Sequence, residues 1–409
     1  VGKNLTEWQF GLASLHPRWN VSGTYMQALP RFVSRNADGT DEKEFLTDYF
    51  PNKGDLYTNV FLKGYEWPFN ARKSRQSSLI DILVYMETVV RGRQVFLDFL
   101  KNPHGLDFSS LSPEAAAYIQ NAGADFGTPV ERLIHMNRPA YEFYLSKGVD
   151  LKTQALPIAL CAQHNNGGLA TDCWWQTNIE GFFAAGEVCG SHGIYRPGGS
   201  ALNAGQVGSM RAAQAIAANR MQSPASREEF LQIANPAVQM CMELAQGALQ
   251  AESNIGELWK NAAQRMSCAG GPVRELQIIR KAVEEAVADL KSLHTVAKIQ
   301  SVVETKKLFA LRDMLIAQVV YLSAMADYAE KGGKSRGSAI YIQPGSHLAE
   351  LSSFFTFETE QPDDHSLIQE VRYAEGKCIF TRRAPRELPP EDDCFENVWK
   401  TYLQNQNIY

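Results

Sequence analysis

The sequence lacks the features that mark nucleic-acid-binding and membrane-spanning proteins. Its 45 Asp and Glu residues outnumber its 40 Lys and Arg residues, and with a formal net charge of -5 and no basic cluster it offers no surface for nucleic acid or anionic lipid. No uninterrupted apolar run approaches the roughly 18 residues of a transmembrane helix, and no charged-then-apolar leader begins the chain. These absences predict a soluble protein without a membrane span.

Cysteine spacing excludes the common metal sites. The seven cysteines are odd in number and contain no C-x-x-C pair, so neither an iron–sulfur set nor a zinc knuckle is indicated. We expect no metal and a reducing, cytoplasmic setting. The cysteines are Cys161, Cys173, Cys189, Cys241, Cys268, Cys378 and Cys394.

A third absence concerns nucleotides. No G-x-G-x-x-G stands anywhere in the chain, although this pattern at a strand-to-helix turn is the usual cradle for the pyrophosphate of a dinucleotide. The length and composition of the chain are those of an ordinary globular protein. Its 409 residues, with 44% apolar and 21% charged side chains, can build a large core and two or three structural units.

The most informative stretch lies between Gln163 and Arg220. Residues 182–185 (FFAA) form a short apolar run that predicts a buried strand, which Gly186 ends. Glu187 is then expected at the carboxyl end of that strand, where open α/β sheets hold ligands and a carboxylate can accept from a ribose or ribityl hydroxyl. The alternative is a surface glutamate that happens to follow a strand.

A glycine-rich turn and a helix come next. The turn, residues 190–199, carries His192 and Arg196, and the helix is expected to begin near Ser200. Uncovered N–H groups at such a start, with about half a positive charge from the helix dipole, accept an anion. An ordinary βα turn is the alternative. Small residues share one face of the helix and predict close packing against a sheet: Gly205, Gly208 and Ala212.

Together these patterns read GG-x-x-TD, T-x-I-x-G-F-F-AAGEV and HG-x-x-R-x-GG-x-A-L. Their order resembles the second flavin-binding segment of the succinate dehydrogenase and fumarate reductase flavoprotein family, to which L-aspartate oxidase belongs. The resemblance implies FAD as cofactor. It also implies a preceding adenine-binding half that this chain lacks, so we expect a longer natural protein or a truncated one. The matching residues are Gly167, Gly168, Thr171, Asp172, Thr177, Ile179, Gly181, Ala184 to Val188, His192, Gly193, Arg196, Gly198, Gly199 and Leu202.

The fold implied by this resemblance is α/β plus α+β: a partial, Rossmann-like FAD-binding domain with an inserted capping domain and a C-terminal helical domain. Local patterns add a helix over 77–90, a strand over 94–100 and two long antiparallel helices in 273–293 and 304–333. The expected units are the end of the FAD-binding half (1–12), the capping domain (13–150), the second FAD-binding segment (151–222), the helical domain (223–345) and a C-terminal strand and coil region (346–409).

The resemblance also assigns candidate catalytic residues. Arg75, in the segment SRQSS, corresponds to the arginine that protonates the substrate carbon, although a solvated cation at a helix entry is an equal alternative. Arg196 is expected to hold an anionic or carbonyl oxygen, and His192 lies in the same turn. Gln163 stands where the family has a histidine that grips a substrate carboxylate. His164, one position later, is expected to point to the opposite face of the strand as a structural histidine.

Candidate cofactor contacts follow from the same segment, where the helix start at Ser200 would stabilise negative charge on the reduced flavin. They are Gly167, Gly168, Gly186, Glu187, Gly198, Gly199, Ser200, Ala201 and Leu202.

The reaction implied is hydride transfer between the flavin N5 and a carbon–carbon bond next to a carbonyl or carboxyl group, with an unidentified electron donor or acceptor. The family's His-Pro-Thr after a Gln-Phe pair is replaced here by Gly11 to Ala13, so we expect a larger, less charged enone or unsaturated monoacid to be favoured over fumarate and succinate. The alternatives are a non-catalytic flavin-binding or partner-binding subunit, or a truncated fragment of such a flavoprotein.

Overall fold

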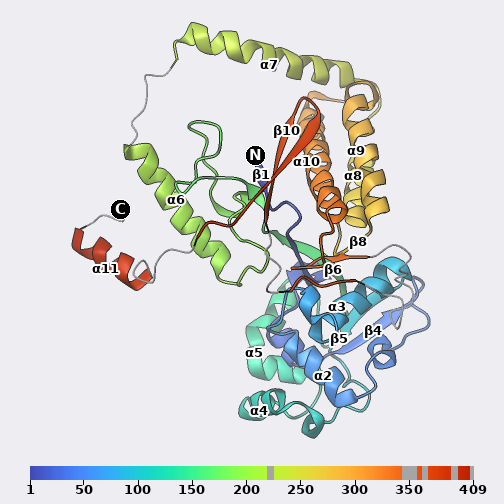
Figure 1. The fold of residues 1–409 in the computed structure, drawn as a ribbon. Coiled ribbons are helices and arrows are strands. Elements are labelled where there is room, and N and C mark those ends of the chain that lie inside the picture. Colours follow the sequence, from blue (N-terminus) through green and yellow to red (C-terminus); the bar gives the residue numbers. More distant parts are fainter. Residues whose placement is uncertain (219–224, 343–356, 362–366, 388–394, 406–409) are drawn as a thin grey trace.

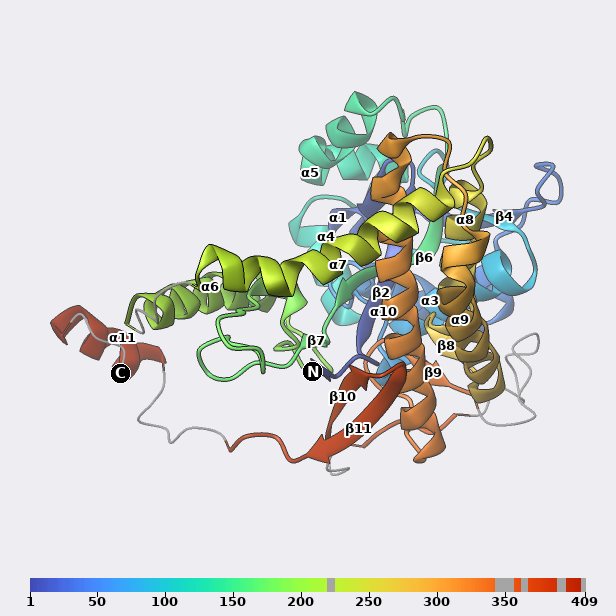
Figure 2. The same cartoon turned by 90° about the horizontal axis from the view of Figure 1, so that it is seen from above.

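The structure is a computed structural model that describes residues 1–218, 225–342, 357–361, 367–387 and 395–405 (Figures 1 and 2). The strands are β1 Gly2–Lys3, β2 Trp8–Leu15, β3 Arg18–Asn20, β4 Arg31–Arg35, β5 Gln94–Asp98, β6 Leu156–Asn165, β7 Gly168–Leu169, β8 Val273–Arg274, β9 Ile340–Tyr341, β10 Ile368–Ala374 and β11 Lys377–Arg383. The α-helices are α1 Thr24–Gln27, α2 Lys53–Leu62, α3 Ser77–Tyr85, α4 Pro113–Asn121, α5 Pro129–Ser146, α6 Ser200–Ala218, α7 Arg227–Ala248, α8 Ile255–Ala269, α9 Leu276–Val296, α10 Thr305–Glu330 and α11 Phe395–Asn405.

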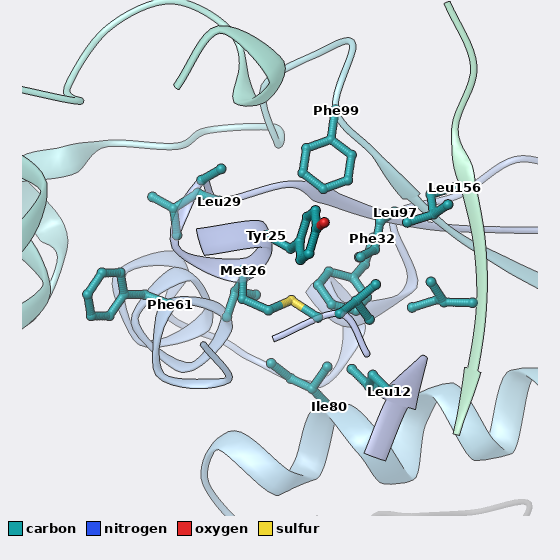
Figure 3. Close-up of a cluster of buried hydrophobic side chains, with 14 of the residues drawn as sticks. Leu12, Tyr25, Met26, Leu29, Phe32, Phe61, Ile80, Leu97, Phe99 and Leu156 are labelled. Atoms are coloured by element: carbon teal, nitrogen blue, oxygen red, sulfur yellow. The ribbon is translucent and has the colours of Figure 1, made fainter. Parts of the chain in front are cut away.

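A five-stranded antiparallel sheet, in the order β3-β2-β6-β5-β4, forms the first region together with α1 to α5 (Figure 1). Its core joins side chains from the sheet and the helices, among them Leu12 of β2, Met26 of α1 and Ile80 of α3 (Figure 3). The predicted helix over 77–90 is confirmed as α3 and a π-helical continuation, Met86–Val90, and the predicted strand over 94–100 is confirmed as β5.

Strand β6 contains a β-bulge that changes the direction of its side chains. Its register with β2 pairs His164 with Gln9 and Ala162 with Phe10, which leaves Gln163 as the extra residue. An extra residue interrupts the alternation of faces along a strand. Gln163 and His164 still lie on opposite faces of β6, as the sequence predicts, and the bulge instead leaves Ala162 and Gln163 beside the same cavity.

A second antiparallel sheet, in the order β11-β10-β1-β7, joins the first residues of the chain to its last strands. Its member β7 immediately follows β6, so the two sheets lead the chain directly from one to the other. The expected C-terminal strand and coil region contains β10 and β11, whereas α11 in the same region was not predicted. Most of the segment SSFFTF, like the expected boundaries at 222/223 and 345/346, lies outside the described residues.

Helices α7 to α10 make up the helical region, and α9 and α10 confirm the two long helices (Figure 1). Every apolar residue predicted on the buried face of α10 is buried: Leu308, Leu311, Leu315, Val319, Leu322 and Met325. By length and hydropathy alone, residues 302–330 also pass for a membrane span. Because their apolar face packs against α8, α9 and the sheet strand β10, the same composition suits the central helix of a bundle.

A buried cluster of charged residues, Arg336, Glu7 and Glu360, connects the segment that follows the helical region to the start of the chain. The Arg336 guanidinium lies 2.8 Å from Glu7 and 3.1 Å from Glu360, and these carboxylates raise its pKa. The next residue, Gly337, has a positive φ of 54°, and its carbonyl accepts a hydrogen bond from the N–H of Ala71. Residues 335–337 therefore fix the position of the turn before α3.

Two expectations about residues 182–212 need correction. Residues 182–185 form no strand, because their one ladder contact is a single bridge between Gln176 and Phe183, and Glu187 consequently lies in a 3₁₀ turn, Gly186–Val188. Helix α6 begins at Ser200 as predicted, but its small residues do not face a sheet: a side chain at Gly208 would overlap the indole of Trp175. The loop before α6 takes the place of the expected sheet.

Candidate active site

Arg196 is held in place by Gln9. The Gln9 Oε1 accepts hydrogen bonds from Arg196 Nε at 2.9 Å and Nη2 at 2.6 Å, while its Nε2 donates to the Arg196 carbonyl at 3.4 Å. Arg196 Nη1 donates to the carbonyl of Gly198 at 3.0 Å. Burial lowers the pKa of the guanidinium, whereas Glu187 opposes that shift. A neutral amide orients Arg196 without cancelling its charge, so the cation stays available for an anion.

Arg196 and Gln9 line a cavity of about 210 Å³ between the first region and the turn before α6. Trp67 closes one part of it, and Gly11 leaves the space that the Trp67 indole occupies. The other lining residues are Glu66, Pro68, Phe69, Asn70, Lys73, Ile194, Tyr195, Pro197, Gly337 and Ser338. A cavity of this size takes a small molecule.

Lys73 and Glu66 form an ion pair in the wall of this cavity, and Ser77 donates a hydrogen bond to the same carboxylate. The sequence analysis did not identify either residue. Arg75 was identified, but its side chain is exposed, does not line the cavity and has no hydrogen bond or ion pair with another described residue. Lys73, rather than Arg75, thus lines the same cavity as Arg196.

His164 pairs with Gln9 across β6 and β2, lines a neighbouring cavity with Glu187, and interacts with the charge of Arg196. Its ring centroid lies 4.8 Å from that of His192, its Nε2 lies 3.6 Å from Glu187 Oε2, and its Nδ1 lies 3.2 Å from Asn166 Oδ1. Burial lowers the pKa of both histidines, and Arg196 lowers both further. His192 Nε2 is buried and has no hydrogen-bond partner in the described part of the chain.

Gln163 points elsewhere. Its Nε2 donates to Asn20 Oδ1, and its side chain lines a separate cavity with Trp8 and Phe10. His164 therefore lies on the face of β6 that carries Gln9 in β2, and Gln163 lies on the opposite face. No sequence signal marks the bulge, although the resemblance alone placed a histidine within one residue of this position.

The start of α6 borders a further cavity of about 380 Å³. Four of the predicted cofactor-binding residues line this cavity. These are Gly186, Glu187, Ala201 and Leu202, joined there by His164, Ala185, Gly205, Gln206 and Ser209. Gly198 and Gly199 have open space where a side chain would project, and Ser200 donates its hydroxyl to the carbonyl of Pro197. The anion-accepting helix start is therefore accessible.

Glu187 stands between this cavity and a neighbouring one of about 420 Å³, which Gly167 and Gly168 help to line. Its Oε1 accepts a hydrogen bond from the N–H of Asn165 at 2.9 Å, so it also fixes the end of β6. Both glycines are buried, and a side chain on either would overlap backbone atoms of Asn4 or Val188. Their small size is thus needed for packing, whether or not they also contact a cofactor.

Comparison with known proteins agrees with this geometry. Residues 2–202 match the family model described as "FAD binding domain". A fumarate reductase (CoM/CoB) subunit from Methanothermobacter marburgensis is 43% identical over 81 residues, 20% of this chain and 15% of that protein. L-Aspartate oxidase from Mycobacterium leprae is 39% identical over 74 residues, 18% of this chain and 14% of that protein.

The whole fold has a counterpart among solved structures. The FrdA chain of Escherichia coli quinol fumarate reductase superposes with a TM-score of 0.58 at 18% identity, covering 95% of this chain and 60% of that chain. This chain therefore spans less than two thirds of the length of the proteins that it resembles. Residues 2–202 thus match the FAD binding domain family, segments of the chain are similar to a fumarate reductase subunit and to L-aspartate oxidase, and the fold is similar to that of FrdA.

Proposed function

We propose that the chain is the substrate-binding part of an FAD-dependent oxidoreductase that acts on the carbon–carbon bond of a small unsaturated acid. One observation carries this proposal: Arg196, oriented by Gln9, lines a small cavity, and its charge interacts with His164, His192 and Glu187. In this proposal residues 13–150 are a capping domain, the protein is soluble and cytoplasmic, and another molecule or protein chain supplies or removes the electrons.

The residues present fit FAD. Glu187 offers an acceptor for a sugar hydroxyl, the start of α6 offers backbone donors for an anion, and the glycines before it leave open space. His192 Nε2 adds a buried polar atom that lacks a partner among the described residues. When bound, FAD would accept or donate the hydride, and the protein would supply binding, orientation and electrostatics.

Arg196 would bind the carboxylate of the substrate. A guanidinium can pair with a carboxylate through two parallel hydrogen bonds, and partial burial strengthens such a pair. Arg196 keeps one edge engaged with Gln9, so its remaining N–H groups set the orientation of the acid. The pair also draws electron density from the adjacent carbon–carbon bond, which prepares that bond for hydride transfer.

Arg75 remains our proposed proton donor. It lies in the turn that follows Lys73, and Lys73 lines the substrate cavity. An arginine can donate only if a relay restores its proton, because its ordinary pKa is above about 12. In that relay the Glu66 carboxylate, which is paired with Lys73 and accepts a hydrogen bond from Ser77, would take up a proton from solvent and pass it on to Arg75.

The charge of the cavity favours a monocarboxylic acid. Lys73, the second cation of the wall, is already paired with Glu66. A second buried carboxylate would therefore lack a full partner, which is costly. We infer that a short unsaturated monoacid binds better than fumarate.

A second candidate function is partner binding without catalysis. Helix α7 favours it, because Phe230, Ile233 and Met240 are 62, 79 and 70% exposed, which is unusual for large apolar side chains gathered on one helix. This candidate does not need Arg196 to act on a substrate.

Reoxidation of reduced flavin separates the two functions. The natural protein that contains this chain would be reduced anaerobically and mixed with crotonate, and the flavin absorbance would be followed. The enzyme proposal predicts reoxidation in wild type and in Arg138→Met, a control in an exposed residue of α5, but not in Arg196→Met with its flavin still bound. A flavin that stays reduced with crotonate, fumarate and every related acid would favour partner binding.

A further inference from the structure

A second cavity, of about 490 Å³, lies on the other side of β2 from the Arg196 site. It is bounded by β2 and β3, by the end of α3 and its continuation, by β6, and by the last turn of α8. Its volume is within the usual range of small-molecule sites, roughly 300–1,000 Å³. Because its walls come from both the first region and the helical region, a ligand bound there would connect the two.

The strands keep the two cavities apart. Gln9 of β2 lines the Arg196 cavity, whereas its neighbours Trp8 and Phe10 line the second cavity, as alternation along a strand requires. On β6 His164 pairs with Gln9, whereas the preceding residue Gln163 lines the second cavity. The second cavity is therefore a separate site.

Large apolar side chains at this cavity are unusually exposed. Leu15 is 51%, Trp19 52% and Val89 56% exposed, and all three are lining residues. Trp19 is fixed by a contact with the Phe143 ring, 4.8 Å between centroids, so it presents a rigid aromatic surface. Tyr85, Leu160 and Met266 extend the apolar wall. A flat aromatic ring would remove much of this area from water.

The polar groups that line the second cavity favour a ligand that is negatively charged and carries a hydrogen-bond acceptor. Arg18 lines it and forms no ion pair with any described residue, and the lining contains neither Asp nor Glu. The Trp8 indole N–H is buried and has no acceptor in the described part of the chain. At the end of α8, Arg274 already occupies the carbonyls of Gly270 and Gly271, so this helix end presents less negative charge to a ligand.

We propose that this second cavity binds an aromatic carboxylic acid that carries a hydrogen-bond acceptor on its ring. The ring lies against Trp19 and Met266, Arg18 pairs with the carboxylate, and the Trp8 indole N–H donates to the ring substituent. The proposal is independent of the function suggested for the Arg196 site, because the two cavities share none of their lining residues.

Fluorine NMR of the chain labelled with 5-fluorotryptophan tests this site. The probe is 4-hydroxyphenylacetate, its neutral control is 4-hydroxyphenylacetamide, and Trp8→Phe and Trp19→Phe assign the two resonances. We expect the acid to shift both resonances and the amide to bind at least tenfold more weakly. An acid that leaves both resonances unmoved at millimolar concentration, or an amide that binds equally well, would overturn the proposal.

Two variants test the assigned contacts. Arg18→Gln changes an exposed residue and should weaken the acid at least tenfold, whereas Arg138→Gln, the matched loss of an exposed cation elsewhere, should leave the affinity unchanged. Ala162→Met, at an exposed lining residue, should fill the cavity and abolish binding. Circular dichroism confirms that each variant is folded. Unchanged affinity in folded Arg18→Gln and Ala162→Met would show that the acid binds elsewhere.

Discussion

The side-chain amide of Gln9 forms hydrogen bonds with both the side chain and the backbone of Arg196. Its Oε1 accepts from the guanidinium at 2.6 and 2.9 Å, and its Nε2 donates to the Arg196 backbone carbonyl. The two residues lie 187 positions apart in the chain, yet they form the wall of one cavity. The side chain most suited to bind a carboxylate is thus oriented before any substrate arrives, which lowers the entropic cost of binding.

Replacing Gln9 should therefore weaken substrate binding more than it slows turnover. In Gln9→Ala, Arg196 keeps its charge but loses its orienting contacts, and we expect KM for the preferred acid to rise about tenfold, or about 1.4 kcal/mol. Steady-state kinetics of the natural protein measure this, with Gln154→Ala, an exposed glutamine, as control. A fall in kcat at constant KM would show that Gln9 serves the chemical step instead.

Glu187 should contribute to FAD affinity. Its carboxylate borders both cavities near the start of α6, so Glu187→Ala should cost on the order of 1–3 kcal/mol of FAD binding free energy. Titration calorimetry of the flavin-free protein gives the affinity, and Glu180→Ala, in the same loop and exposed, is the control. Equal FAD affinity in Glu187→Ala and wild type would remove Glu187 from the cofactor site.

The paired histidines should make the protein less stable in mild acid. Burial lowers the pKa of His164 and His192, so between about 6.5 and the folded-state values the unfolded chain binds more protons. The contribution of the two neutral histidines to the free energy of unfolding is fully present above their pKa in the unfolded chain. It is lost as the pH falls through their lower pKa in the folded protein. Urea unfolding at neutral pH and near about pH 5 should show this loss, reduced in His164→Gln but not in His294→Gln, on the exposed face of α9. An equal loss in His164→Gln and wild type would exclude His164 as its source.

Residues 1–409 alone should not retain FAD. A dinucleotide usually rests its pyrophosphate on a glycine-rich strand-to-helix turn, and the chain contains no G-x-G-x-x-G. Leu202, at the start of α6, is exposed rather than covered. Purification followed by an absorbance spectrum and extraction of the flavin would check the expectation. A stoichiometric yellow chromophore on this chain would contradict it.

The sequence predicted elements well where local periodicity decided them. The helix over 77–90, the long helix α10 with its buried apolar face and the start of α6 at Ser200 all follow from local spacing and glycine positions. Such features depend on neighbours within a few turns, which the sequence itself displays.

Features that depend on distant partners were not predictable in this way. The run 182–185 has the composition of a strand but finds only a single bridge partner, and the bulge at Gln163 appears only when β6 is aligned with β2. The ion pair of Lys73 and Glu66 likewise depends on how the turn before α3 folds back. These are tertiary effects, which override local propensity.

The last prediction concerns the substrate and the proton. We expect a short monoacid such as crotonate to have a higher kcat/KM than fumarate, because Arg196 can hold one carboxylate while Lys73 is already paired with Glu66. Arg75→Ala should lower kcat by about 10²-fold if Arg75 supplies the proton, whereas Lys73→Ala, which changes the wall, should mainly raise KM. Steady-state assays of both acids with wild type and the two variants decide the matter. If fumarate had the higher kcat/KM of the two acids, the cavity would accommodate two carboxylates. If Arg75→Ala were active and Lys73→Ala inactive, Lys73 rather than Arg75 would be the proton donor.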